Sequence, residues 1–123
     1  MKLIHVAVAA TLAVLAVSPA FADCTAPTPP QSLPDGNTAT LQQMLAGKKS
    51  VDEFNTATNA YLDCLTQAHK DALDAAGPKI SSDDKDALEK TETDKHNAAV
   101  ERLKDVADRF NAQIRIFKQK SAH

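Results

Sequence analysis

The chain has 123 residues, with 14 Lys or Arg against 16 Asp or Glu, so its formal net charge at pH 7 is −2. This balance argues against nucleic acid as a partner. The chain has no Trp, one Tyr and four Phe. A core must therefore be built mainly from Leu, Ala, Val and Ile, and a domain of this size then benefits from a covalent crosslink or a partner.

Residues 1–22 have the pattern of a cleaved export signal. Lys2 precedes a mostly apolar run over residues 6–17, and Ala20-Phe21-Ala22 matches an A-x-A cleavage site. The apolar run is too short for a transmembrane helix with ordinary flanks. A lipid anchor on the first cysteine is disfavoured because an acidic residue precedes it. We therefore expect a soluble periplasmic protein.

Residues 23–37 are predicted to form an extended arm. Proline fixes φ and cannot donate a backbone hydrogen bond, which excludes a helix or a central strand here. The sequence Pro34-Asp35-Gly36-Asn37 is typical of a turn that ends the arm. The prolines that restrict the arm to extended, polyproline-like conformations are Pro27, Pro29, Pro30 and Pro34.

Residues 38–76 are predicted to form the first long helix, in which apolar or small residues recur every seven positions. Thr40 and Gln43 resemble a capping box. Gly47 could interrupt the helix, but the apolar face keeps its phase across it, which favours one continuous helix. Gly77-Pro78 then ends the helix. The two seven-residue series are Met44, Val51, Thr58, Leu65 and Ala72, and Gly47, Phe54, Tyr61, Ala68 and Ala75.

Residues 82–118 are predicted to form the second helix, capped by Ser81 or Ser82. The two helices together predict an all-α fold, a long antiparallel helical hairpin of coiled-coil character over residues 38–123. Its length is roughly 55 Å at ~1.5 Å per residue. If the turn centres near Lys79, His96 lies close to Leu62. The seam of the second helix contains His96, Leu103, Phe110 and Phe117.

Cys24 and Cys64 are the two cysteines, and an even pair in an oxidising compartment is most simply a disulfide. The first helix rises about 39 Å from Thr38 to Cys64 at ~1.5 Å per residue. The arm spans about 43 Å from Cys24 to Thr38 at ~3.1 Å per residue. The two lengths agree, so a bond within one chain is predicted. A bond between two chains and free thiols are the alternatives.

Four polar side chains near Cys64 are predicted to form a structural cluster, with His96 hydrogen-bonded across the seam. A metal site is not expected, because His69 lies about one heptad away from His96 along the axis and ligands must converge. No nucleophile, phosphate loop or pair of carboxylates accompanies them, so we expect neither an enzyme nor a cofactor. The members of this cluster are Asn59, Tyr61, Asp63 and His96.

A basic segment closes the second helix, with no acidic residue after Asp108. Compensation of the helix dipole is its simplest interpretation. Binding to an anionic lipid headgroup, a peptidoglycan component or an acidic protein surface is the alternative. The basic residues are Arg109, Arg115, Lys118 and Lys120.

The apolar stripe of the first helix is wider than one partner helix needs. The arm, a second hairpin or a client protein could cover the surplus. The surplus residues are Leu41, Leu45, Leu62 and Leu73.

Several spaced blocks of this sequence together resemble a family of small, exported, uncharacterised proteobacterial proteins. The blocks are Cys24 with the prolines that follow it, Pro34-Asp35-Gly36, residues 59–65, His96-Asn97 and Phe110-Asn111-Ala112-Gln113-Ile114-Arg115-Ile116-Phe117-Lys118. The resemblance implies a periplasmic helical hairpin with its two cysteines paired, and it carries over no activity.

The expected function is that of a non-enzymatic periplasmic protein acting through protein contacts, as a chaperone-like protein, an adaptor or an inhibitor. The expected partner is an unidentified periplasmic protein, with a homodimer as a further option. An oligomeric structural component of the envelope that binds an anionic surface is one alternative. A carrier of a small ligand or a metal is the other.

Overall fold

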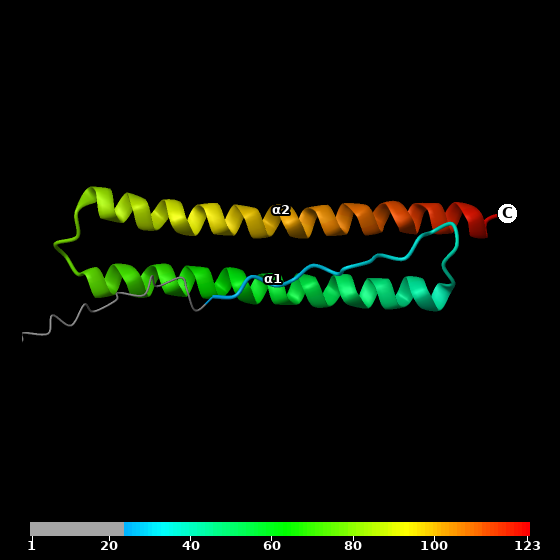
Figure 1. Ribbon diagram of the computed structural model, residues 1–123, viewed down its shortest axis with the longest axis horizontal. Helices are drawn as coiled ribbons and strands as arrows, with labels where there is room; N and C mark the ends of the chain where they lie inside the picture. Colours follow the sequence, from blue (N-terminus) through cyan, green and yellow to red (C-terminus); the bar gives the residue numbers. More distant parts are fainter. Residues whose placement is uncertain (1–23) are drawn as a thin grey trace, which may run out of the picture.

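The computed structural model describes residues 24–123. The predicted export signal, residues 1–22, lies outside these residues. Two helices, α1 (Leu41–Ala76) and α2 (Ser82–Ser121), form an antiparallel hairpin (Figure 1). The predicted all-α hairpin is confirmed, and the described part of the chain contains no strand. No helix in residues 24–123 is long and apolar enough to cross a membrane.

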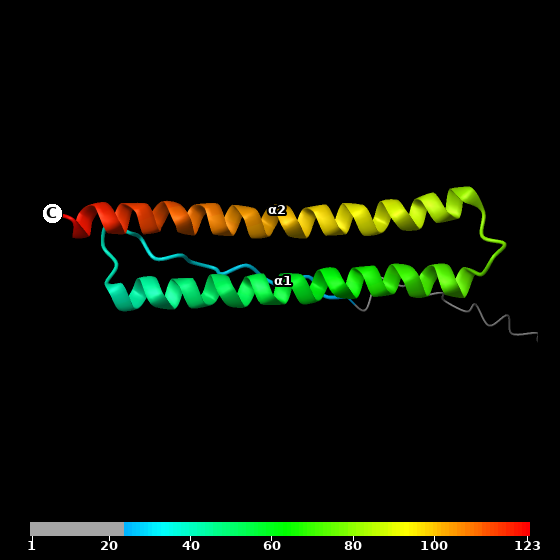
Figure 2. The same cartoon turned by 180° about the vertical axis from the view of Figure 1, so that it is seen from behind.

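The arm runs alongside both helices over half of the hairpin. It starts near the middle of α1 and reaches the end where α1 begins and α2 finishes, which we call the open end (Figures 1 and 2). The opposite end, where a short connection joins α1 to α2, is the loop end. The arm therefore adds a third layer to the open half of the hairpin only.

Thr40 caps the N-terminus of α1 with the predicted capping box. Its hydroxyl accepts a hydrogen bond from Gln43 N at 3.2 Å, and Gln43 Oε1 accepts one from Thr40 N at 2.8 Å. The helix begins at Leu41, three residues later than the predicted start at residue 38. The difference has a local cause: the amides of Thr38 and Ala39 both donate to the carbonyl of Asp35 and so belong to a turn.

At the loop end both caps match their predicted residues. Gly77 ends α1 with φ 74°, a conformation that favours glycine, and its N–H donates to the carbonyl of Leu73. Ser81 caps α2, its hydroxyl accepting from Asp84 N at 3.1 Å. The α2 helix continues to Ser121, three residues beyond the predicted end at residue 118.

The buried core lies in the open half of the hairpin. One cluster joins Ala39, Met44 and Phe110 at the open end, with Leu33 of the arm packed against it. By contrast, no residue from 66 to 98 is buried. Two helices alone leave their shared seam partly exposed. The seam is buried only in the half where the arm forms a third layer. The buried apolar residues are Ala39, Met44, Phe54, Leu65, Ala99, Val106 and Phe110.

Gly47 does not interrupt α1, and the arm touches the helix closely at this residue. A Cβ atom built there would lie 2.6 Å from both Cγ and Cδ of Pro34 and 3.0 Å from Cε2 of Phe110. The absent side chain lets the Pro34 ring rest on the helix. Gly47 and Phe110 also face each other across the hairpin, as a turn centred near Lys79 predicts.

Gly47→Ala tests this contact. Alanine stabilises a free helix by up to ~1 kcal/mol relative to glycine. Here we expect a net loss of roughly 1–2 kcal/mol in unfolding free energy, because overpacking costs about 1–3 kcal/mol. Urea unfolding followed by circular dichroism measures it. The control Ala46→Gly, at the exposed neighbouring position, reports the propensity difference alone, and a Gly47→Ala variant more stable than the wild type would contradict the contact.

Candidate functional site

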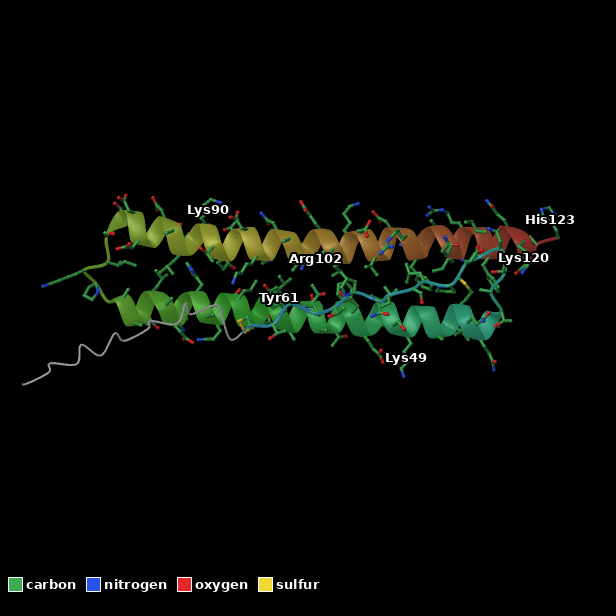
Figure 3. The ribbon with its side chains drawn as sticks, viewed as in Figure 1. Lys49, Tyr61, Lys90, Arg102, Lys120 and His123 are labelled. Atoms are coloured by element: carbon green, nitrogen blue, oxygen red, sulfur yellow. A yellow bond between two sulfur atoms is a disulfide. The ribbon has the colours of Figure 1, made fainter. Side chains whose placement is uncertain are left out.

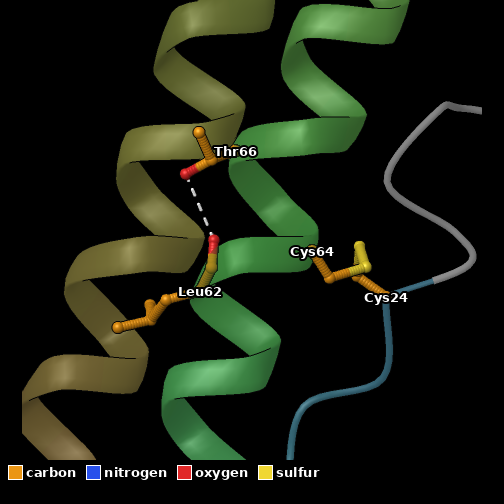
Figure 4. Close-up of a disulfide and its surroundings, with 4 residues drawn as sticks. All are labelled: Cys24, Leu62, Cys64 and Thr66. Carbon is orange, nitrogen blue, oxygen red and sulfur yellow. Dashed lines mark hydrogen bonds between the residues drawn. A yellow bond between two sulfur atoms is a disulfide. The ribbon is translucent and has the colours of Figure 1, made fainter.

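A disulfide joins Cys24 at the start of the described arm to Cys64 in the middle of α1, with a Cα–Cα distance of 5.8 Å. The predicted bond within one chain is therefore confirmed. In Figure 4, Cys64 points toward the arm, whereas Leu62 points toward α2. Both cysteines are half-buried. The bond holds the arm against α1 at the boundary between the open half and the loop half.

The arm is fixed by packing and hydrogen bonds at residues 34–39, which we call the anchored turn. Gly36 N donates to Oε1 of Gln113 in α2 at 2.8 Å. A Cβ at Gly36 would lie 2.3 Å from the backbone oxygen of Gln113 and 2.8 Å from the nitrogen of Phe117. The carboxylate of Asp35 accepts from the backbone amide of Asn37 at 2.9 Å. The anchored turn thus packs against the backbone of α2 through a residue without a side chain.

Residues 25–33, which we call the strap, lie between the disulfide and the anchored turn. Within residues 24–123, no hydrogen bond involves any strap residue. Open hollows flank it on both sides: one of about 540 Å³ between the strap and α1, bordered by Phe54 and Ala57, and one of about 430 Å³ between Pro29 and α2, bordered by Arg102 and Val106. The strap therefore rests on the helices through apolar contact and is held by its two ends.

The arm covers one side of the hairpin seam and leaves apolar side chains exposed elsewhere. The exposed fractions are 61% for Leu41, 57% for Leu45 and 42% for Val100. Leu62 and Leu73, the other predicted surplus residues, are half-buried. Part of the predicted surplus therefore remains open to solvent at the open end of α1.

The four residues of the predicted polar cluster differ in burial. Asn59 and Asp63 are exposed, whereas Tyr61 and His96 are half-buried. Figure 3 labels Tyr61 near the middle of α1. In the described part of the chain, no hydrogen bond or ion pair joins any two of these four residues. Across residues 24–123, no group of three or more His, Cys, Asp or Glu could hold a metal ion.

Thr58 is a buried polar residue. The seven-residue pattern predicts its position in the seam but says nothing about the environment of its hydroxyl. Thr58 is 0% exposed, and its Oγ1 has no hydrogen-bond partner in the described structure. A buried hydroxyl without a partner destabilises the folded state. The periodicity of the helix identifies the position, but whether a partner reaches the hydroxyl depends on the packing of the neighbouring side chains.

The four predicted basic residues separate into two kinds. Arg109 pairs with Asp105, Nε to Oδ2, at 3.0 Å. Arg115, Lys118 and Lys120 are exposed and make no ion pair within residues 24–123. Lys120 projects at the open end (Figure 3). These three residues place positive charge without an ion-pair partner at the last turns of α2, where the negative end of the helix dipole lies.

Lys104 lies one turn before Asp108, and this neighbour changes the pKa of the Lys104 side chain. The hydrogen bond to Asp108 and then the charge of its carboxylate raise the pKa of the Lys104 ammonium. Both side chains are largely exposed, so the pair adds little to stability. It is a feature of the solvated face and not of the site.

Comparison with family models, with curated proteins and with solved structures gives no match to this chain.

Replacing both cysteines tests how much the disulfide contributes. Closing a loop of the observed separation, 40 residues, stabilises a protein by about 4 kcal/mol in the chain-entropy model. We expect Cys24→Ser with Cys64→Ser to lose about 3–4 kcal/mol of unfolding free energy, measured by urea unfolding. Oxidised wild type and wild type in a thiol reductant are the matched controls. Equal stability of all three samples would contradict the estimate.

Thr58→Val tests the unpaired hydroxyl. Valine has nearly the shape of threonine and removes the buried polar group, so we expect a gain of about 1 kcal/mol in unfolding free energy. Thr56→Val is the control, since Thr56 is exposed and donates to the carbonyl of Asp52 at 3.0 Å. That substitution should change stability by less than about 0.5 kcal/mol. A loss of stability in Thr58→Val would show that the hydroxyl has a partner.

Proposed function

We propose that the protein acts in the periplasm through contacts with another protein, as a chaperone-like protein, an adaptor or an inhibitor, and that it catalyses no reaction. The observation that carries the proposal is the uneven covering of the hairpin. The arm completes the core over the open half. In that same half, Leu41 and Leu45 at the start of α1 remain exposed. Such surface marks a place for a partner.

Leu41 and Leu45 form the centre of the proposed contact. They lie four residues apart on one helix and therefore on one face. Their exposed fractions, 61% and 57%, are the largest among the exposed large apolar residues of the described chain. Lys48 and Lys49 follow on the next turn and are exposed. An apolar pair with a charged rim is the usual composition of a protein contact surface.

Two features together support the proposed compartment. The apolar segment and cleavage pattern of residues 1–22 support export. The Cys24–Cys64 bond supports an oxidising environment, because disulfides persist outside the reducing cytosol. A protein of this kind in the periplasm meets unfolded and partly assembled clients, which suits a chaperone-like or adaptor role.

Aggregation of a chemically denatured client protein, followed by light scattering, tests the proposal. We expect the mature protein to suppress aggregation, and Leu41→Gln with Leu45→Gln to suppress it at least about fivefold less, because the substitutions remove about 2 kcal/mol or more of apolar contact. Ala75→Gln, an exposed position at the loop end of α1, is the control and should keep full activity.

Sedimentation of the same samples separates the two leading classes of function. A monomer that suppresses aggregation supports the contact protein. A stable dimer that has no effect in the assay would contradict it and would favour the oligomeric envelope component instead.

A further inference from the structure

We propose that the strap covers a groove between α1 and α2 that binds extended, proline-containing peptide segments, and that reduction of the Cys24–Cys64 disulfide opens this groove. The site lies beneath the arm and is separate from Leu41 and Leu45, so it does not depend on the contact surface proposed above.

The first argument is the way the arm is attached. The anchored turn is held by one hydrogen bond, from Gly36 N to Gln113, and by the close fit of Pro34 to Gly47, and neither contact involves the disulfide. The strap has no hydrogen bond of its own in the described structure, and hollows of about 540 and 430 Å³ lie beside it. The disulfide is therefore the main restraint on the strap. Breaking it releases residues 24–33 and leaves the anchored turn in place.

The second argument is the surface that the strap covers. Phe54 of α1 and Val106 of α2 are 5% and 1% exposed and border the hollows on the two sides of the strap. Removing the strap would expose them to water in the middle of an elongated channel. Polar side chains such as Ser50 and Arg102 border the same strip. A long strip with an apolar centre and polar borders favours an extended chain over a compact ligand.

The third argument is that the strap itself shows which ligand fits. Residues 24–34 contain four prolines and no charged residue. A polyproline-like chain has no internal hydrogen bonds and loses little entropy on binding. It can therefore bind through the fit of its rings, as the strap does here without a hydrogen bond to the helices. A peptide with the same features is the ligand class that this groove would accept.

The opening step is a thiol–disulfide exchange with a dithiol reductant. A thiolate of the dithiol attacks one sulfur of the Cys24–Cys64 bond, forming a mixed disulfide and releasing the other cysteine as a thiolate, which takes up a proton. The second thiol of the dithiol then closes its own disulfide and releases the remaining cysteine. Two electrons and two protons enter the cysteine pair, and the dithiol is oxidised to a disulfide. The half-buried state of both cysteines leaves room for the attack.

Fluorine NMR of the full protein labelled with 4-fluorophenylalanine tests the opening. Phe54 borders the strap, whereas Phe110 lies beneath the anchored turn and serves as the internal control; both are almost fully buried. After reduction by a dithiol, we expect broadening by a soluble gadolinium chelate to increase at least threefold for Phe54 and to stay unchanged for Phe110. Equal protection of Phe54 in both states would overturn the proposal. So would exposure of both rings together, which indicates unfolding.

Capture of a peptide by the Cys24→Ser variant tests the ligand class. Cys64 is then free to form a disulfide with a synthetic peptide Cys-Thr-Ala-Pro-Thr-Pro-Pro-Gln-Ser-Leu in a glutathione buffer. The matched control peptide carries glycine in place of the three prolines, and the tethered strap competes equally with both. We expect at least tenfold greater capture of the proline peptide at equilibrium, measured by mass spectrometry. Equal capture of the two peptides would contradict a groove that recognises an extended proline-containing chain.

Discussion

Two helices cannot enclose a shared apolar seam from every side, and the structure of this protein follows from that constraint. A third layer is needed, and the arm supplies it over the open half through Pro34 on Gly47 and Gly36 on α2. At these two places the missing Cβ atoms let backbone and ring approach closely enough to exclude water. Buried residues such as Met44 and Phe110 gather there, whereas residues 66–98 contain none. The distribution of buried residues along the hairpin follows the extent of the arm.

The arm combines two kinds of attachment with different physical properties. The anchored turn is held by packing and hydrogen bonds, which respond to temperature and denaturant. The strap is held by a covalent bond, which responds to thiols and not to small changes in temperature. In the opening that we propose, the anchored turn remains folded while the strap is released. A small protein with a thin core would then carry a movable element without losing its fold.

Much of the fold could be predicted because the relevant signals are local. Gly77 and Ser81 mark the loop end, the seven-residue pattern gives both helices, and the length of the arm agrees with the Cys24–Cys64 pairing. The contacts of Gly36 and Gly47 could not be predicted, since they depend on how each helix rotates about its axis. From the sequence, Gly47 was interpreted as a possible break in the first helix. Its place in the same series as Phe54 was the available signal that it faced the core.

The candidate site could be predicted from the sequence only in part. Periodicity assigns a residue to a face but does not say how far the neighbouring layer extends. Leu41 and Leu62 belonged to the same predicted surplus, yet the first is exposed and the second half-buried. The lack of a partner for the Thr58 hydroxyl likewise depends on which side chains come within hydrogen-bonding distance. The same holds for Arg109, which forms an ion pair, and for Lys120, which forms none in the described residues.

Amide hydrogen exchange along the oxidised hairpin tests the central claim that the arm forms the third layer of the open half. Exchange by local opening is fastest where few apolar contacts are buried. The account predicts that amides of residues 44–64 and 99–117 exchange at least about tenfold more slowly than those of residues 66–76 and 84–98, helix ends excluded. Uniform protection along both helices would contradict it.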